Sequence, residues 1–335
     1  MDPITTTTSP SSARVAQSDQ KHDGAPGGPG AERPARGLRS LLRGLVQLAR
    51  PRQWTKNLLV FAAPAAAGVL DNTEPAVDAL IAFAAFCLAA AGTYYINDAR
   101  DADADRLHPT KRTRPVASGA VPLAVAYAGG AVLLAGSVAL GLAASPQLAA
   151  TILGYVALTT AYSAVLKNVA VVDLVAVAAG FVLRAVAGAA ATDVPISDWF
   201  FIVTSFGALF IVSGKRGAEA SEMAGATTSD PRRFRAVLGA YSEGYMAYLR
   251  SVTSGAVLVA YCLWAFERAD TAVDQSIPWY QLSILPFVMA VLRYALVLDK
   301  GDRGSAPEDI ILGDRTLQCI GVAWAIVFAI GVYTA

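Results

Sequence analysis

One stretch of acidic and amide side chains stands out, directly after a long apolar segment. Its members are Asn97, Asp98, Asp101 and Asp105. On a helix, at 100° per residue, these four side chains fall within about 100° of one another. Carboxylates packed this closely repel, and hard oxygen ligands favour Mg²⁺ completed by water and substrate phosphates. The spacing predicts a cation site; the alternative is a solvated acidic loop paired with nearby arginines.

A basic loop follows the acidic stretch at once. Pro109 and Pro115 bound its centre, and within or beside this segment lie His108, Lys111, Arg112, Arg114, Ser118 and Gly119. Cations beside a metal suit a diphosphate or a phosphate ester, because together they neutralise an anionic leaving group. Anchoring of the loop to the membrane surface accounts for some of these cations, but not for their position next to four acidic or amide side chains.

Two further groups of polar residues lie within or beside apolar segments. Tyr162 and Lys167 precede Asp173 and Arg184, and the last two share a helical face about 16 Å apart. Ionised groups inside a membrane normally face the protein interior. A structural ion pair is the alternative for Asp173 and Arg184.

The second of these groups contains Lys215, Arg216 and Glu219, with Gly214 and Gly217 between and beside them. Lys215 and Glu219 are four residues apart and meet on a helix. The glycines leave backbone amides open to an anion. Cations extending from a helix end toward the membrane surface are the alternative.

The composition indicates that these groups belong to a membrane protein. Of 335 residues, 55% are hydrophobic and 16% are charged, against about 25% charged in an average soluble domain. The mean hydropathy is +0.46. A net charge of +1 provides no overall field for nucleic acid, so we expect no nucleic-acid partner.

Apolar segments near the roughly 20 residues needed to cross a bilayer predict an all-α polytopic protein with nine transmembrane helices in one bundle, with eight or ten as alternatives. The candidate spans cover residues 57–70, 76–97, 120–143, 147–165, 169–190, 199–213, 245–266, 279–298 and 316–334. Small residues such as Gly180, Ala187 and Gly188 allow close helix packing within the bundle and permit homo-oligomers.

The segment before the spans divides into two parts. Residues 1–37 are rich in Ser, Thr, Pro and Gly and predict a disordered cytoplasmic tail. Residues 38–52 predict an amphipathic helix on the membrane surface, with a short cytosolic helix as the alternative. Residues 53–335 then form the catalytic domain.

Charge in the connections between spans predicts the orientation. Basic connections alternate with acidic ones, so the positive-inside rule places the amino terminus in the cytoplasm and the carboxyl terminus outside. We expect a multi-pass protein of the plasma membrane.

The run from Asn97 to Asp105 matches the pattern N-D-x-x-D-x-x-x-D. In a polytopic protein this resembles the signature of the UbiA-type intramembrane prenyltransferase superfamily, and the resemblance extends from about residue 48 to the end. It implies nine helices around a cytoplasm-facing cavity in which Mg²⁺-dependent catalysis takes place.

The chain departs from the ordinary aromatic prenyltransferases after the sixth span. Gly214, Lys215, Arg216 and Glu219 stand where those enzymes carry a second aspartate-rich motif. With the residues from Arg50 to Asn57, this pattern resembles the branch that acts on decaprenyl phosphate. The resemblance implies transfer of a 5-phosphoribosyl group from phosphoribosyl diphosphate to decaprenyl (polyprenyl) phosphate, with release of diphosphate, toward a lipid-linked arabinofuranose donor for the cell wall.

The resemblance also implies roles for individual residues. Asn97, Asp101 and Asp105 would bind Mg²⁺, with Asp98 supporting them. Lys56, Lys111 and Arg114 would hold the donor diphosphate. Lys167, Arg184, Lys215 and Arg216 would share the two other phosphates, and Asp173 or Asp98 would stabilise positive charge at the anomeric carbon. Further substrate-binding candidates are Tyr95, His108, Tyr162 and Glu219.

Two other functions are compatible with parts of the sequence. One is an ordinary prenyltransferase with an aromatic or haem-like acceptor, against which the missing second aspartate motif argues. The other is a transporter, in which intramembrane Asp173 and Arg184 would line a pathway. A transporter has no need of an acidic cluster beside a basic loop.

Overall fold

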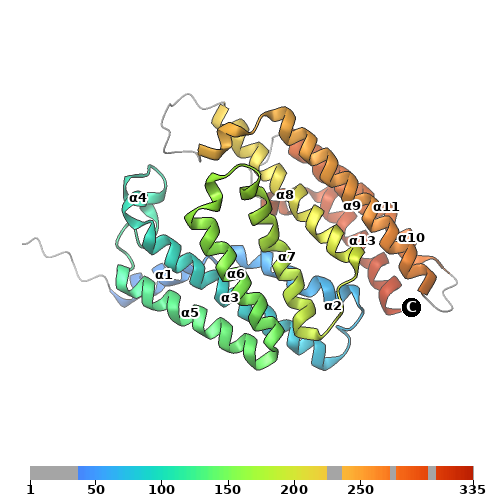
Figure 1. Cartoon of the computed structure of the whole chain (residues 1–335), viewed down its shortest axis with the longest axis horizontal. Coiled ribbons are helices and arrows are strands. Elements are labelled where there is room, and N and C mark those ends of the chain that lie inside the picture. The colour runs from blue at the N-terminus through green and yellow to red at the C-terminus, as the bar shows by residue number, and fades with distance from the viewer. Residues whose placement is uncertain (1–36, 225–235, 272–276, 301–306, 335) are drawn as a thin grey trace, which may run out of the picture. The chain divides into compact units, whose positions relative to one another are not determined.

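Long apolar segments joined by short polar connections fold into helices throughout the described part of the chain. A computed structural model describes residues 37–224, 236–271, 277–300 and 307–334, and residues 37–335 form a single unit. Of the disordered tail expected at residues 1–37, residues 1–36 lie outside the described residues. The expected all-α architecture is confirmed for the described chain (Figure 1).

The helices are interrupted by short 3₁₀ segments. The α-helices are α1 (Leu38–Ala49), α2 (Ala62–Ala66), α3 (Thr73–Arg100), α4 (Ala102–Leu107), α5 (Leu123–Ala144), α6 (Pro146–Ala164), α7 (Val172–Thr192), α8 (Asp198–Ala224), α9 (Glu243–Thr271), α10 (Trp279–Leu282), α11 (Ile284–Lys300), α12 (Pro307–Gly313) and α13 (Arg315–Tyr333). The 3₁₀ helices are η1 (Pro51–Phe61), η2 (Lys111–Thr113), η3 (Leu166–Asn168) and η4 (Ala236–Ala240).

The described residues contain seven candidate membrane spans, two fewer than expected. They are α3, α5, α7, α8, α9, α10 with α11, and α13. The two expected spans that do not qualify correspond to η1 with α2, and to α6. The structure therefore establishes a multi-span α-helical protein without confirming the number nine.

The helix α6 is long enough but too polar to count among the candidate spans. Its 19 residues include Tyr155, Thr159, Tyr162 and Ser163, and these four side chains line a polar cavity. Part of the polarity that lowers the hydropathy of α6 thus lies on the face that contributes to this cavity.

The first expected span divides into a 3₁₀ helix, η1, and a short α-helix, α2, and residues at its start and on α7 shape this segment. Arg50 takes a left-handed φ of 52° before η1, and Pro51 occupies the first turn. Gly188 of α7 lies against the backbone of η1, where an added Cβ would come within 1.7 Å of the Val60 carbonyl oxygen. A glycine is therefore required for α7 to approach η1 this closely.

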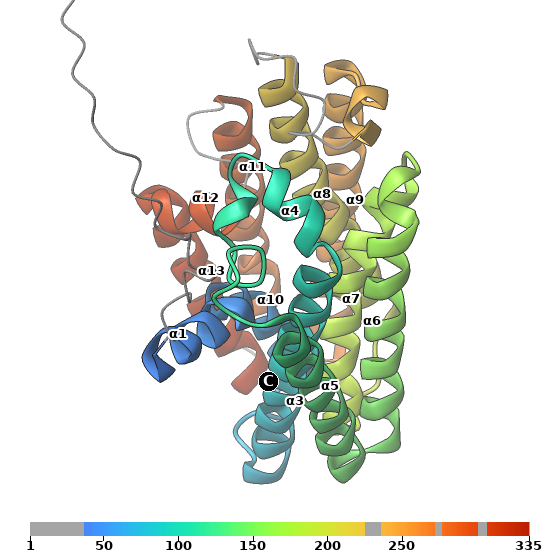
Figure 2. The ribbon, with the colours of Figure 1, turned by 90° about the vertical axis from the view of Figure 1, so that its left-hand side faces the viewer.

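Three groups of contacts hold the long helices together. α3 packs along α5 and α8 along α9, while α7 contacts α3, α6, α8 and η1 (Figures 1 and 2). Phe86, Leu148 and Ile152 are fully buried in the core between α3, α6 and α7. Leu174 and Met246 are buried in a second core between α7, α8 and α9. α7 is thus the central helix that both cores share.

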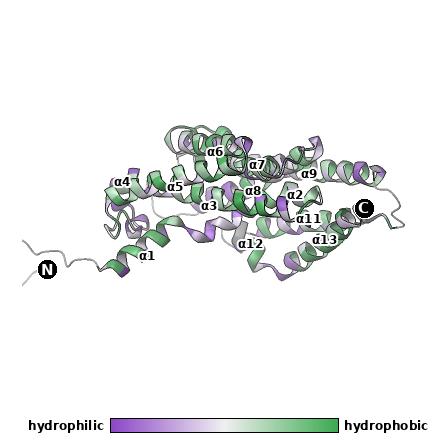
Figure 3. Cartoon of the chain, turned by 90° about the horizontal axis from the view of Figure 1, so that it is seen from below, coloured by the Kyte–Doolittle hydropathy of each residue, from purple (hydrophilic) through white to green (hydrophobic). Residues whose placement is uncertain are grey.

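Outward-facing positions on the long helices are apolar, as a lipid environment requires. Val132, Leu153, Leu285 and Leu292 each expose more than half of their surface. Colouring by hydropathy shows apolar residues along most of the long helices (Figure 3). Exposed apolar surface on this scale is unfavourable in water and favourable against lipid.

The helix α1 is amphipathic and is attached to the bundle through one face. Leu48 is fully buried, and the Tyr95 hydroxyl of α3 donates a hydrogen bond to the Leu45 carbonyl oxygen at 2.8 Å. Leu38, Leu42 and Val46 form an exposed apolar row on another face. This row has the chemistry of a helix that lies at a membrane surface.

Candidate functional site

A polar cavity of about 590 Å³ lies between η1, α3, α6, α7 and the basic loop after α4. Many of the residues expected at the site line it. They are Lys56, Asn97, Asp98, Asp101, Lys111, Arg114, Tyr162, Lys167 and Arg184. The residues that do not line it are Tyr95, Asp105, His108, Asp173, Lys215, Arg216 and Glu219.

The buried carboxylate of Asp98 is held by two arginines. Arg50 Nη2 donates to both carboxylate oxygens, at 2.7 and 3.0 Å. Arg114 Nη1 lies 3.3 Å from Asp98 Oδ1 and 2.8 Å from Asp105 Oδ2. The Arg50 guanidinium also lies over the Tyr94 ring, 4.6 Å from its centroid. Asp98 therefore fixes the positions of both guanidinium groups.

The acidic stretch does not form one continuous helical face, which corrects the expectation from spacing. α3 ends at Arg100 and α4 begins at Ala102, because Asp101 between them has φ −89° and ψ 3°. Asp101 is exposed and lines the cavity, whereas Asp105 is 4% exposed and paired with Arg114. The break separates two carboxylates that the sequence predicts to act together.

The oxygen donors that line the cavity fit a magnesium ion that shares its coordination with a substrate. Among the described residues, no group of three or more His, Cys, Asp or Glu side chains could hold a metal ion by itself. Asn97 on the last turn of α3 and Asp101, which directly follows α3, both line the cavity. Mg²⁺ typically takes one or two carboxylates and completes its shell with water and phosphate oxygens. This donor set suits that arrangement.

Arg184 lies on the face of α7 that lines the cavity. It is buried, with 7% of its surface exposed. Its Nε donates to Asn57 Oδ1 at 2.8 Å, Nη1 to the Gly180 carbonyl oxygen at 2.6 Å, and Nη2 to the Tyr155 hydroxyl at 3.0 Å. These three acceptors are neutral. Arg184 therefore brings a positive charge into the cavity wall.

The residues expected after the sixth span join a separate buried cluster. Arg216 Nε donates to Asp173 Oδ2 at 2.9 Å, Nη1 to Glu219 Oε2 at 2.5 Å, and Nη2 to the Tyr162 hydroxyl at 2.9 Å. Lys215 Nζ lies 4.0 Å from Glu219 Oε1. The guanidinium of Arg216 is thus compensated by two carboxylates.

Asp173 in this cluster has a second partner on the chain before α9. The Tyr241 hydroxyl donates to Asp173 Oδ1 and accepts a hydrogen bond from the Val171 amide at 2.8 Å. Burial and the bond to Asp173 raise the pKa of Tyr241 above its usual value. Val171 has φ 68°, a conformation that is unfavourable for a β-branched residue. The cluster thus holds the start of α7 in place.

Two other side chains that were expected at the site, Tyr95 and His108, are buried away from the polar cavity. Tyr95 is 6% exposed and tethers α1 through Leu45. His108 is 9% exposed; its Nδ1 lies 3.3 Å from the Thr110 amide nitrogen, and its Nε2 is buried without a hydrogen-bond partner in the described chain. The structure brings neither side chain to the lining of the polar cavity.

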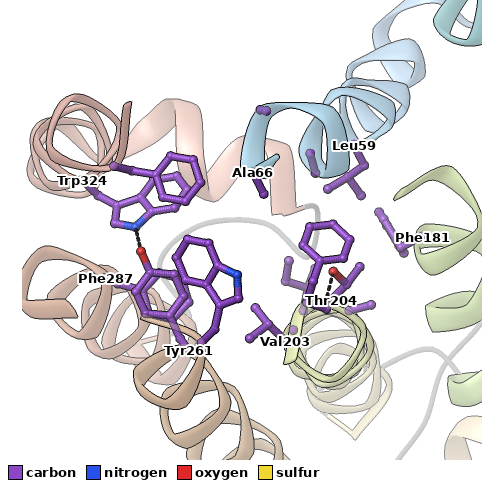
Figure 4. Close-up of a pocket in the computed structure, with 16 residues that line it drawn as sticks. Leu59, Ala66, Phe181, Val203, Thr204, Tyr261, Phe287 and Trp324 are labelled. Atoms are coloured by element: carbon purple, nitrogen blue, oxygen red, sulfur yellow. Dashed lines mark hydrogen bonds between the residues drawn. The ribbon is translucent and has the colours of Figure 1, made fainter. Parts of the chain in front are cut away.

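A second, apolar cavity of about 320 Å³ adjoins η1, α2 and α7 and extends to α8, α9, α11 and α13. Phe181, Val203, Phe287 and Trp324 point into it from four helices (Figure 4). In its wall, Trp324 Nε1 donates to the Tyr261 hydroxyl at 2.7 Å. Phe181 lines both cavities.

The sequence was compared with known families and proteins. A model of the UbiA prenyltransferase family matches residues 58–309, which is more than half of the chain. The chain belongs to the UbiA prenyltransferase family. A protein of Corynebacterium glutamicum named decaprenyl-phosphate phosphoribosyltransferase is 41% identical over 301 residues, covering 88% of each chain. The protein of that name from Mycolicibacterium smegmatis is 43% identical over 298 residues, 85% of this chain and 91% of its own.

Solved structures of proteins with lower sequence identity show the same fold. A UbiA homologue from Archaeoglobus fulgidus bound to GPP and Mg²⁺ has a TM-score of 0.64 and 19% identity, and the match covers 87% of this chain and 100% of the other. Digeranylgeranylglyceryl phosphate synthase has a TM-score of 0.59 and 14% identity, covering 88% of this chain and 99% of the other. The described helices therefore adopt the UbiA fold.

In this UbiA family member, several residues line the cavity or contact a residue that lines it, although the sequence predicted no site role for them. They are Arg50, Asn57, Tyr94, Tyr155 and Phe181. Arg50 and Asn57 stand in the polar run before the first expected span, and that position was the available signal. Tyr94, Tyr155 and Phe181 lie within apolar helices, where an aromatic residue is usually part of the core.

Proposed function

We propose that this chain is a decaprenyl-phosphate phosphoribosyltransferase. It transfers a 5-phosphoribosyl group from phosphoribosyl diphosphate to decaprenyl phosphate and releases diphosphate. The observation that carries the proposal is the identity of 41–43% over at least 85% of the chain to proteins of that name. The chemistry of the polar cavity supports it independently.

The polar cavity suits two substrates that both carry phosphate. Its lining contains six cationic side chains and two carboxylates. The cations are Arg50, Lys56, Lys111, Arg114, Lys167 and Arg184. A neutral aromatic acceptor has no use for so many cations, whereas a polyanionic donor and an anionic acceptor both gain from them.

The donor diphosphate would bind at the end of the cavity near Asp101. Asn97 and Asp101 would hold Mg²⁺ there, and the ion would neutralise charge on the leaving diphosphate. Lys56, Lys111 and Arg114 line the same cavity and would bind diphosphate oxygens. Asp105 would act through Arg114, which it orients at 2.8 Å.

The transfer exchanges one C–O bond for another at the anomeric carbon. The bond from this carbon to the diphosphate oxygen breaks, and a bond to an oxygen of the acceptor phosphate forms. Because the acceptor is already an anion, no general base is required. Asp98 lines the cavity, but Arg50 and Arg114 compensate its charge, so we assign to it the orientation of these two guanidinium groups.

The cluster of Asp173, Arg216 and Glu219 has a different part in this proposal. Arg216 is 3% exposed and Asp173 is fully buried, and their charges compensate each other. We assign to this cluster, with Lys215 at its edge, the task of holding α7 against α8. It acts on the substrates by positioning α7, which carries Arg184, and by orienting Tyr162, which lines the polar cavity.

The proposal includes the placement of the chain in the plasma membrane. The amino terminus and the Asp101 end of the cavity face the cytoplasm, where the soluble donor is found, and α1 lies at the membrane surface. η1 with α2 and α6 complete the nine membrane segments of residues 53–335. The alternation of basic and acidic connections supports this orientation.

Transfer of radiolabel from phosphoribosyl diphosphate to decaprenyl phosphate, with the full chain in detergent and with either Mg²⁺ or EDTA, tests the proposal. We expect labelled lipid only with Mg²⁺. Transfer of a prenyl group from geranyl diphosphate to an aromatic acceptor, without labelling from phosphoribosyl diphosphate, would establish the ordinary prenyltransferase instead.

A further inference from the structure

The buried side chain of Arg184 has an environment unlike that of the other buried arginine, Arg216. Arg216 is ion-paired with Asp173 and Glu219. Among the described residues, no carboxylate forms an ion pair with Arg184, whose hydrogen bonds go to an amide, a carbonyl and a phenol oxygen. The cation–π contacts of its guanidinium are with Tyr155, at 4.7 Å, and Phe181, at 5.9 Å.

A buried cation without a charged partner is costly, so its environment favours the binding of an anion. A guanidinium has five N–H donors. The three hydrogen bonds that Arg184 donates use one N–H at each nitrogen, which leaves two for a ligand in the cavity that this side chain lines. Two donors in a planar fork match the oxygens of a phosphate group.

Arg184 lies where the polar cavity meets the apolar one. Phe181, one turn away on α7, lines both cavities. On η1, Asn57 contacts Arg184, and Leu59 two residues later lines the apolar cavity. The cavity-lining residues on α3 and directly after it run from Ala90 to Asp101, about 16 Å along the helix axis. The metal-binding end and the apolar end of the polar cavity are thus separated.

We propose that Arg184 binds the phosphate of the lipid acceptor and that Asn57 is the positioning residue that orients its guanidinium. This inference rests on the proposed function and makes it specific. A polyprenyl phosphate needs a cation directly beside an apolar cavity, and Arg184 meets both requirements. The donor is soluble and needs no apolar surface, and its phosphates have Lys56, Lys111 and Arg114.

Hydrogen bonds at both ends of its side-chain amide hold Asn57 in one orientation. It is fully buried, its Nδ2 donates to Cys87 Sγ at 3.2 Å, and its Oδ1 accepts from Arg184 Nε at 2.8 Å. Because the thiol sulfur takes the amide donor, the carbonyl oxygen faces the guanidinium. The neutral amide orients Arg184 without cancelling its charge, and an acidic residue at this position would compete with the phosphate.

The test compares Michaelis constants for the two substrates in the full chain. For Arg184→Gln we expect the KM for decaprenyl phosphate to rise about tenfold or more, the size of a lost hydrogen bond to a charged group. The KM for phosphoribosyl diphosphate stays near the wild-type value. A raised donor KM with an unchanged acceptor KM would assign Arg184 to the donor and overturn the inference.

Asn57→Asp separates positioning from structural support, because it keeps the shape of the side chain and adds a charge beside Arg184. We expect it to raise the acceptor KM, while Asn57→Ser, which keeps an oxygen acceptor, retains more acceptor affinity. Equal effects of both variants on the two Michaelis constants would contradict the role of Asn57. Size-exclusion elution and the thermal midpoint report whether each variant is folded.

A measurement on the wild-type chain does not depend on the folding of variants. A polyprenyl phosphate with a photoreactive group on its first isoprene unit is expected to crosslink to the η1 or α7 peptides around Leu59 and Phe181. Crosslinks confined to other helices would overturn the inference. If the wild-type chain transfers no label from phosphoribosyl diphosphate, the proposed function itself fails, which is a different result from unaltered acceptor binding in Arg184→Gln.

Discussion

Arg50 and Asp98 lie 48 positions apart and form a two-point ion pair, with Arg50 Nη2 at 2.7 and 3.0 Å from the two carboxylate oxygens. Arg50 connects α1 to η1 in a left-handed conformation with φ 52°, which is unfavourable for a residue with a side chain. Asp98 belongs to the last turns of α3. The pair thus fixes the entry to η1 against the acidic end of the cavity.

Asp98→Asn is expected to reduce transfer at least about tenfold, because two guanidinium groups lose the charged acceptor that orients them. Arg50→Gln is expected to have a related effect. In a double-mutant cycle on activity the two changes should be coupled by roughly 0.5–3 kcal/mol, the range for residues in direct contact. Strictly additive effects would show that the ion pair does not contribute to the site.

Removal of the metal ligand is expected to abolish transfer selectively. Asp101→Ala should reduce Mg²⁺-dependent labelling of the lipid at least about 100-fold, and EDTA should have the same effect on the wild-type chain. Asp103 is the matched control, because its side chain is 96% exposed and pairs with Arg106 away from the cavity. Asp103→Ala should keep near-normal activity; an equal loss in both variants contradicts the assignment.

The basic loop provides a second matched pair, Lys111 and Arg112. Both are exposed, but only Lys111 lines the cavity. Lys111→Gln should raise the KM for phosphoribosyl diphosphate about tenfold, because a contact to a charged oxygen is lost. Arg112→Gln should leave it unchanged. If both variants respond alike, the loop acts through its net charge rather than through Lys111 itself.

Gly188 is expected to be intolerant of substitution. In Gly188→Ala the new methyl group meets the Val60 carbonyl oxygen, so η1 has to move away from α7 at a cost of about 1–3 kcal/mol. We expect a lower thermal midpoint in detergent and reduced activity, because η1 carries Lys56 and Asn57. Gly154 has no atom within 4 Å of its ideal Cβ position, so Gly154→Ala should leave both quantities unchanged.

The pair of Asp173 and Arg216 is expected to control stability rather than substrate affinity. Asp173→Asn leaves a buried guanidinium with one partner fewer, and loss of a buried pair costs about 3–5 kcal/mol. We expect a lower thermal midpoint, with Michaelis constants near wild type in the fraction that remains folded. Lys215→Gln is the control, because Lys215 lies at 4.0 Å from Glu219 and is 37% exposed. A selective rise in the acceptor KM for Asp173→Asn would instead place this cluster at the substrate.

Local patterns in the sequence predicted the helices well, because each apolar segment had to become a helix in order to satisfy its backbone hydrogen bonds in lipid. The segment expected at residues 120–143 is α5 (Leu123–Ala144), and that at 316–334 is α13 (Arg315–Tyr333). The same reasoning counted η1 with α2 as an ordinary span. It could not foresee that Gly188, more than a hundred residues later, lies against the backbone of η1.

From sequence alone, the composition determined that this is a helical membrane protein, and the motif around Asp101 predicted a phosphate-binding site, because residue type and helical spacing act locally. The tertiary structure decided which charges remain for substrates. In the sequence, nothing distinguishes the charges available to a substrate, such as Asp101 and Arg184, from Asp105, Asp173 and Arg216. In the structure these last three are paired with partners that lie as many as 68 positions away. Whether a buried charge is compensated depends on which helices meet, and only the packed bundle settles that.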